Sequence, residues 1–131
     1  MRFHRTSIQG VIRIEPEKQA DGRGYFARIW CAREAAAEGL RTPMVQYSMA
    51  FNETKGTLRG LHYHAEAFPQ VRVIRCTAGA AFVALADLRP GSATFLRTFD
   101  IILDARNQTA IYAPPGVALG YQTLADQTMM C

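Results

Sequence analysis

The sequence predicts an all-β domain, built as a jelly roll or a small β-barrel, with one short helix. Many short runs of β-branched and aromatic residues are separated by turn clusters of glycine, proline, aspartate or asparagine. Only residues 32–38 have the composition of a helix. With 131 residues and 49% hydrophobic content, the chain is expected to be a single domain, residues 1–131, with a buried core.

The first half of the chain is expected to hold three strands and the helix. The strands are predicted at residues 8–14, which could also be a strand pair, at 25–30 and at 45–49. Asp21–Gly24 places glycines around an arginine and is expected to be a turn or loop. The helix is expected to stop at Gly39, because glycine is the usual residue just past a helix end.

After residue 70 the β pattern becomes denser. Further strands are predicted at residues 71–76, 80–88, 95–103, 109–113 and 121–124. Residues 80–88 form a nearly continuous apolar run, which is typical of a strand buried on both faces. Residues 95–103 alternate between apolar and polar side chains instead. An interior lined by alternate residues of such strands can hold a ligand.

A pair of histidines in the stretch Gly56–Glu66 indicates a reactive site. His62 and His64 are two of only three histidines in the sequence. Residues two apart on a strand share a face, so both imidazoles are expected to point the same way. The unperturbed pKa of histidine lies nearest neutrality, which suits proton transfer and metal ligation. A lone histidine is more often structural, but this pair lies beside Arg59 and Glu66.

The net charge of +4 comes mainly from arginine, with 13 arginines and 2 lysines in the chain. A basic surface can bind nucleic acid, but the arginines are scattered singly and form no basic run, so we expect no nucleic-acid partner. A small phosphorylated ligand explains the same bias, because arginine grips phosphate in a planar, bidentate way.

The cysteines and the termini bear on the cellular compartment. Cys31, Cys76 and Cys131 are odd in number and too widely spaced for a disulfide framework or a Cys-x-x-Cys metal site. The N-terminus lacks the apolar core of a signal peptide, and no apolar run has the length of a membrane span. We expect a cytoplasmic protein with reduced thiols and no membrane partner.

Two segments resemble the metal motifs of the cupin jelly roll. The first, His62-x-His64-x-Glu66, supplies two imidazoles and a carboxylate, which could bind a divalent transition metal. The second ends at Leu119, which stands where that motif has a further histidine. A metal cupin that uses His62, His64 and Glu66 is therefore the less favoured interpretation, and we expect no metal and no other cofactor.

A closer resemblance is to the dTDP-4-dehydrorhamnose 3,5-epimerase family, whose members are metal-free enzymes on a cupin-like jelly roll. Its most specific signature, K-G-x-L-R-G-L-H-[YF], is similar to residues 55–63. Its D-x-R-G-[FY]-F element is similar to residues 21–26, and its V-Q step to residues 45–46. Later landmarks match at residues 87–95 and 114–121, so the resemblance covers nearly the whole chain.

The resemblance implies an enzyme that inverts C3 and C5 of a dTDP-4-keto-6-deoxyhexose, in deoxysugar biosynthesis of the dTDP-rhamnose type. Both carbons flank the C4 ketone, so loss of a proton from either gives an enolate. The resemblance implies that His62 is the general base. It implies that Arg72, in the place of a family lysine, stabilises the enolate oxygen.

The resemblance also implies how the substrate is held. The implied substrate-binding residues are Arg23, Phe26, Gln46, Arg59 and Tyr121. Arg23 and Arg59 match arginines that hold the diphosphate, while Phe26 and Gln46 match residues near the nucleotide. We expect a homodimer, both from the resemblance and because a short β chain must cover its sheet edges.

The chain departs from the family pattern at several positions. Val83 stands in the place of an aspartate, Leu119 in the place of a histidine, and Arg28 in the place of an acidic residue. Family members continue beyond Cys131, with a tyrosine acid just after it and an orienting aspartate further on. We expect a shortened form of a longer epimerase. The alternatives are a divergent enzyme that inverts one centre, and a catalytically impaired domain that only binds a nucleotide sugar.

Overall fold

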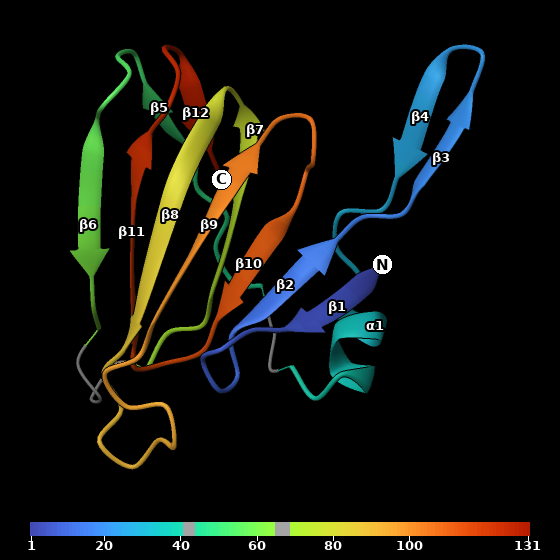
Figure 1. The fold of residues 1–131 in the computed structure, drawn as a ribbon. Helices are drawn as coiled ribbons and strands as arrows, with labels where there is room; N and C mark the ends of the chain where they lie inside the picture. The colour runs from blue at the N-terminus through green and yellow to red at the C-terminus, as the bar shows by residue number, and fades with distance from the viewer. Residues whose placement is uncertain (41–43, 65–68) are drawn as a thin grey trace.

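Two antiparallel sheets pack face to face in the computed structural model, which describes residues 1–40, 44–64 and 69–131 (Figure 1). One sheet has six strands, in the order β1 (Arg2–Arg5), β2 (Ile12–Glu15), β10 (Ala110–Ala113), β7 (Arg72–Ala78), β12 (Thr128–Met130) and β5 (Ala50–Asn52). The other has four, in the order β6 (Leu58–His62), β11 (Val117–Thr123), β8 (Ala80–Asp87) and β9 (Thr98–Asp104). The predicted all-β class is confirmed.

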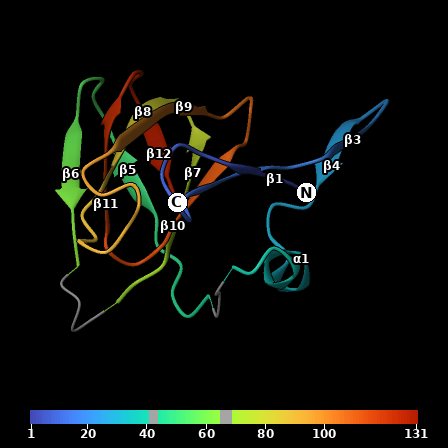
Figure 2. The ribbon, with the colours of Figure 1, turned by 60° about the horizontal axis from the view of Figure 1, so that its bottom comes forward.

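A hairpin and one helix complete the described part of the chain. The hairpin, β3 (Lys18–Asp21) and β4 (Gly24–Ala27), projects away from the sandwich (Figures 1 and 2). The helix, α1 (Ala32–Ala37), ends as predicted, with Gly39 at a φ of +74° just beyond it. Within the described residues, no helix is long and apolar enough to cross a membrane.

The main core lies between the two sheets. Val83 and Leu85 of β8 are buried there against Ile111 of β10. Phe82, the residue before Val83, points to the other face and is 38% exposed. The prediction that residues 80–88 are buried on both faces was therefore wrong, because this chain covers one face of the four-stranded sheet. The outward positions are mostly alanine, which made the run look continuously apolar.

A second, smaller core lies on the outer face of the six-stranded sheet. It contains Ile14 and Tyr112, and Trp30 and Leu40 from either side of α1 pack against it. The helix is also held by Glu34, whose carboxylate accepts hydrogen bonds from the amino group of Met1 and from Arg28, at 2.9 and 2.8 Å. These two cations lower the pKa of Glu34 to about 2. Arg28, one of the departures from the family pattern, thus has a structural partner.

Some predicted strand boundaries differ from the structure. Residues 45–49 are coil, with Val45 88% exposed, and the strand starts only at Ala50, where β12 supplies a partner. Residues 93–96 form a turn, with Leu96 at a φ of +62°, so β9 begins at Thr98. Strands β1, β3 and β12 were not predicted, because all three are short and carry no strong β pattern.

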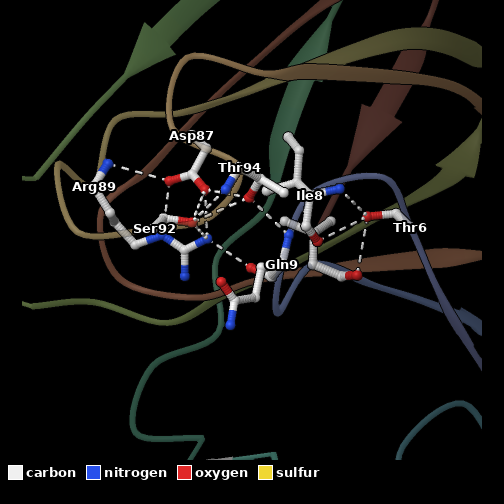
Figure 3. A network of polar contacts seen from close by, with 8 residues as sticks. Thr6, Ile8, Gln9, Asp87, Arg89, Ser92 and Thr94 are labelled. Carbon is white, nitrogen blue, oxygen red and sulfur yellow. Dashed lines mark hydrogen bonds and ion pairs between the residues drawn. The ribbon is translucent and has the colours of Figure 1, made fainter.

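A buried carboxylate, Asp87 at the end of β8, ties the following loop to the sandwich (Figure 3). Its two oxygens accept hydrogen bonds from Arg89 at 2.7 Å each, and Oδ2 also accepts from the hydroxyls of Ser92 and Thr94 at 2.6 Å. Arg89 and Thr94 in turn contact the backbone of Gln9, between β1 and β2. Arg89, followed by the two hydroxyls, holds the pKa of Asp87 far below its ordinary value.

Replacing Asp87 with asparagine is expected to lower the free energy of unfolding at pH 7 by about 3 kcal/mol, because Arg89 loses a buried counter-charge. The folded-state pKa of Asp87 is depressed. Its contribution is therefore present above the ordinary aspartate pKa of about 3.9 and is lost as the pH falls further. Urea unfolding at a series of pH values should show the difference between the wild type and Asp87→Asn shrinking in acid.

The control for this prediction is Asp100→Asn, on the exposed face of β9. This variant is expected to stay within about 0.5 kcal/mol of the wild type. A penalty for Asp87→Asn that is the same at pH 7 and in acid would contradict the role assigned to the charge.

Candidate active site

A β-bulge in β6 brings two predicted site residues to the same face. Leu119 of β11 pairs with His62, and Tyr121 pairs with Arg59, so a step of two residues on β11 matches a step of three on β6. In a regular strand, residues three apart point to opposite faces. The extra residue in β6 offsets this alternation. The side chains of Arg59 and His62 therefore lie on the same face, where Leu119 and Tyr121 are buried.

The bulge depends on glycine at two facing positions. A Cβ on Gly120 would lie 2.8 Å from the carbonyl oxygen of Arg59 and 3.1 Å from the Cα of Leu61. A Cβ on Gly60 would lie 2.8 Å from the Cα of Gly120, and Gly60 has a φ of +94°. Only residues without a side chain allow two backbones to approach in this way.

Arg59 reaches across the sandwich to Asn52 of β5. Its Nε donates to Asn52 Oδ1 at 2.8 Å, and its Nη2 donates to the carbonyl of Phe51 at 3.5 Å. The Tyr121 hydroxyl also lies 3.4 Å from Asn52 Nδ2. Asn52 was not predicted as a site residue. A lone asparagine shortly before a Lys-Gly pair is typical of a turn, and no local signal marks its partner.

Arg72 lies at the start of β7 and crosses from the other sheet to the end of β6. Its Nη2 donates to the backbone carbonyls of His62, at 2.9 Å, and Val117, at 3.0 Å. Burial lowers the pKa of the Arg72 guanidinium, but an arginine side chain stays protonated in proteins. The predicted cation therefore lies next to the predicted base and is held by the main chain.

The wall beside His62 is apolar. Leu119 is its partner on β11, Val83 pairs with Tyr121 on the next strand, and both are buried. These are two of the positions where the sequence departs from the family pattern. The His62 side chain is exposed, and no carboxylate within residues 1–40, 44–64 and 69–131 hydrogen-bonds to its imidazole.

The expectation that His62 and His64 share a strand face was wrong. β6 ends at His62, because its pairing with β11 stops at Leu119, so His64 lies beyond the strand. Glu66, the third member of the alternative metal set, lies outside the described residues. In the part of the chain that the structure describes, no three His, Cys, Asp or Glu side chains are grouped so as to hold a metal ion.

Two of the remaining predicted residues lie on the hairpin, away from this edge. The Arg23 side chain, at the hairpin turn, is 91% exposed and pairs with Asp21, while Phe26 on β4 is 70% exposed. The hairpin and β6 lie on opposite sides of the molecule in both views (Figures 1 and 2). Gln46 is exposed in the coil before β5. Strand pairing and hydrogen bonds link the other predicted residues, which are His62, Arg59, Arg72 and Tyr121.

The fold and these contacts define a β-sandwich domain with an imidazole and two guanidinium groups at one edge, a site suited to proton transfer on an anionic substrate. The sequence model of dTDP-4-dehydrorhamnose 3,5-epimerase matches residues 5–131. The chain belongs to this family of epimerases.

Individual relatives agree with this membership. The chain is 36% identical to the dTDP-4-dehydrorhamnose 3,5-epimerase of Sinorhizobium fredii in an alignment of 134 residues. This alignment covers 99% of this chain and 67% of that protein. The crystal structure of the Bacillus anthracis enzyme of that name, with TDP and PPi bound, superposes with a TM-score of 0.94 at 29% identity, covering 98% of this chain and 74% of that one.

A third comparison includes a sugar nucleotide. The Legionella pneumophila epimerase in complex with dTDP-4-keto-L-rhamnose superposes with a TM-score of 0.89 at 29% identity, covering 98% of this chain and 68% of that one. These superpositions confirm the predicted cupin-like jelly roll. Family membership also favours an epimerase over the metal cupin that was the alternative interpretation.

Gly120→Ala is expected to push β6 away from β11 and to lower the free energy of unfolding by about 2 kcal/mol, because the new methyl group meets backbone atoms. It should also change the NMR signals of the His62 imidazole. Urea unfolding and proton–nitrogen correlation spectra measure the two effects. Gly91→Ala is the matched control, since a Cβ there meets nothing within 4 Å. If Gly120→Ala behaved like Gly91→Ala, the bulge would not depend on that glycine.

Proposed function

We propose that the chain is a nucleotide-sugar epimerase that acts on a dTDP-4-keto-6-deoxyhexose and inverts C3, C5 or both, in deoxysugar biosynthesis. The observation that carries the proposal is the bulge of β6, which puts His62 and Arg59 on one face, beside Arg72. Support comes from the ligands of the relatives, which are TDP and PPi in one structure and dTDP-4-keto-L-rhamnose in another.

Each residue has a separate task in the proposed reaction. The His62 imidazole accepts the proton from C3 or C5 as a general base. The electron pair of the broken C–H bond moves toward C4, and the ketone oxygen becomes an enolate oxygen. The Arg72 guanidinium, fixed by two backbone carbonyls, stabilises that negative charge. Return of a proton to the opposite face of the carbon inverts the centre.

The remaining residues bind the substrate. Arg59 and Arg23 hold the diphosphate, because guanidinium and phosphate oxygens match in a bidentate way. Phe26 and Gln46 bind the nucleotide, and both have exposed side chains. Tyr121, which shares Asn52 with Arg59, completes the binding set.

The proposal includes a homodimer in which the hairpin of one copy completes the site of the other. Arg23 and Phe26 are exposed on a hairpin that projects away from the sandwich (Figure 1). A two-stranded hairpin is marginally stable by itself, so packing of its exposed face against another surface would stabilise it. A second copy would bring these two residues to His62, because within one copy the hairpin and β6 lie on opposite sides of the molecule (Figures 1 and 2).

The proposed compartment is the cytoplasm. Cys31, Cys76 and Cys131 are all free thiols. Free thiols are in keeping with a reducing compartment, where structural disulfides are rare.

His62→Ala is expected to reduce proton exchange at C3 and C5 by about 10²- to 10⁴-fold, the usual contribution of a general base. The affinity for dTDP should change little, because the imidazole is assigned to the sugar ring. Proton NMR of dTDP-4-keto-6-deoxyglucose in D₂O follows the exchange, and calorimetry measures dTDP binding.

The control for the exchange experiment is His4→Ala, which removes the imidazole that contacts Glu15 on the neighbouring strand.

Unchanged exchange in His62→Ala would remove His62 from the mechanism. Exchange at C3 alone in the wild type would make the chain a single-centre epimerase. A wild type that binds dTDP without any exchange would be a nucleotide-sugar-binding domain instead.

Mixing Arg23→Ala with His62→Ala is expected to restore activity that neither variant has alone. In a mixed dimer, one site receives an intact His62 from one copy and an intact Arg23 from the other. Random exchange of subunits should make about half the dimers mixed, so about a quarter of the sites recover. Mixing Arg59→Ala with His62→Ala is the control and should restore nothing beyond the separate variants if both residues act within one copy. Absence of recovery in the first mixture would contradict a shared site.

A further inference from the structure

Asn52 is a buried polar residue that links the two sheets at the site. It is 2% exposed and ends β5, across the sandwich from β6. Its Nδ2 donates to the backbone carbonyls of Thr128, at 3.0 Å, and Ala50, at 3.2 Å. Because both of these partners are acceptors, the side-chain amide has one orientation, with Oδ1 directed at the guanidinium of Arg59.

The contact with Asn52 uses a defined edge of the Arg59 guanidinium. Nε donates to Asn52 Oδ1 at 2.8 Å, and Nη2 donates to the carbonyl of Phe51 at 3.5 Å. These bonds occupy the side of the guanidinium that carries Nε. The end of the group, formed by Nη1 and the second hydrogen of Nη2, is left for the oxygens of a ligand. Arg59 is otherwise an exposed side chain with many rotamers.

We infer that Asn52 is a positioning residue, which holds Arg59 in the orientation that grips the diphosphate of the nucleotide sugar. The inference rests on the proposed function, because that proposal assigns Arg59 to the diphosphate. Asn52 itself contacts no substrate in this scheme and acts through Arg59. A guanidinium held in advance loses less conformational freedom when the ligand binds, so the ligand binds more tightly.

A double-mutant cycle separates this role from general support of the fold. The four proteins are the wild type, Asn52→Ala, Arg59→Ala and the double variant, and calorimetry measures the affinity of each for dTDP. Asn52→Ala is expected to weaken dTDP binding about tenfold in the wild-type background. In the Arg59→Ala background it should weaken binding by less than about twofold, because two residues that act as one unit are not additive.

A second measurement does not depend on dTDP. The Arg59 Nε–H proton should give a slowly exchanging NMR signal in the wild type, since it is hydrogen-bonded to Asn52. The signal should be lost in Asn52→Ala. Asn107→Ala is the matched control, because it removes an amide from the turn after β9, away from the site, and should leave both the signal and dTDP binding unchanged. If Asn52→Ala does not fold, Asn52→Ser carries the same tests with a side chain too short to reach Nε.

The outcomes are distinct. Equal losses of dTDP affinity in the two backgrounds, or no loss in either, would overturn the role of Asn52. An Nε–H signal that survives Asn52→Ala would overturn it as well. A wild type that does not bind dTDP would instead overturn the proposed function, and the Nε–H signal would still decide whether Asn52 holds Arg59.

Discussion

The close approach of Gly60 and Gly120 is the constraint on which the site depends. Two backbones meet there at a distance that a Cβ on either residue would block. The bulge that forms around this contact lets Arg59 and His62 share a face. Contacts between the sheets then follow at the same edge, because Arg59 meets Asn52 and the His62 carbonyl meets Arg72. Arg59 and Arg72, both assigned to the substrate, are therefore also cross-links between the layers.

Local sequence predicted those parts of the fold that local chemistry decides. The helix stops beside Gly39, and the predicted turn at Asp21–Gly24 joins β3 to β4. Residues 45–49 show what local pattern omits, since a strand also needs a neighbour to pair with, and only Ala50–Asn52 have one in β12. The apolar run of β8 likewise did not reveal which face the second sheet would cover.

The candidate site could also be predicted only in part, because local sequence does not show which strands pair. A contiguous signature carries Arg59 and His62, so both were predicted, but their shared face depends on register against β11, which the signature does not contain. Asn52 was missed because its partners come from β6, β11 and β12, which only folding brings together. Arg23 was matched to a motif, yet no sequence pattern tells whether such a residue serves its own copy or another.

The register of β6 also determines which sequence changes an evolving lineage could absorb. Leu58 and Leu61 have exposed side chains, so substitutions there would alter the surface while leaving the spacing from Arg59 to His62 intact. Loss of one residue between Arg59 and His62 would abolish the bulge, and one of these two side chains would then point to the outer face. The motif is thus a constraint on length as well as on Arg59, Gly60 and His62. Descendants of this chain should vary at Leu58 and Leu61 and hardly at all in the number of residues in β6.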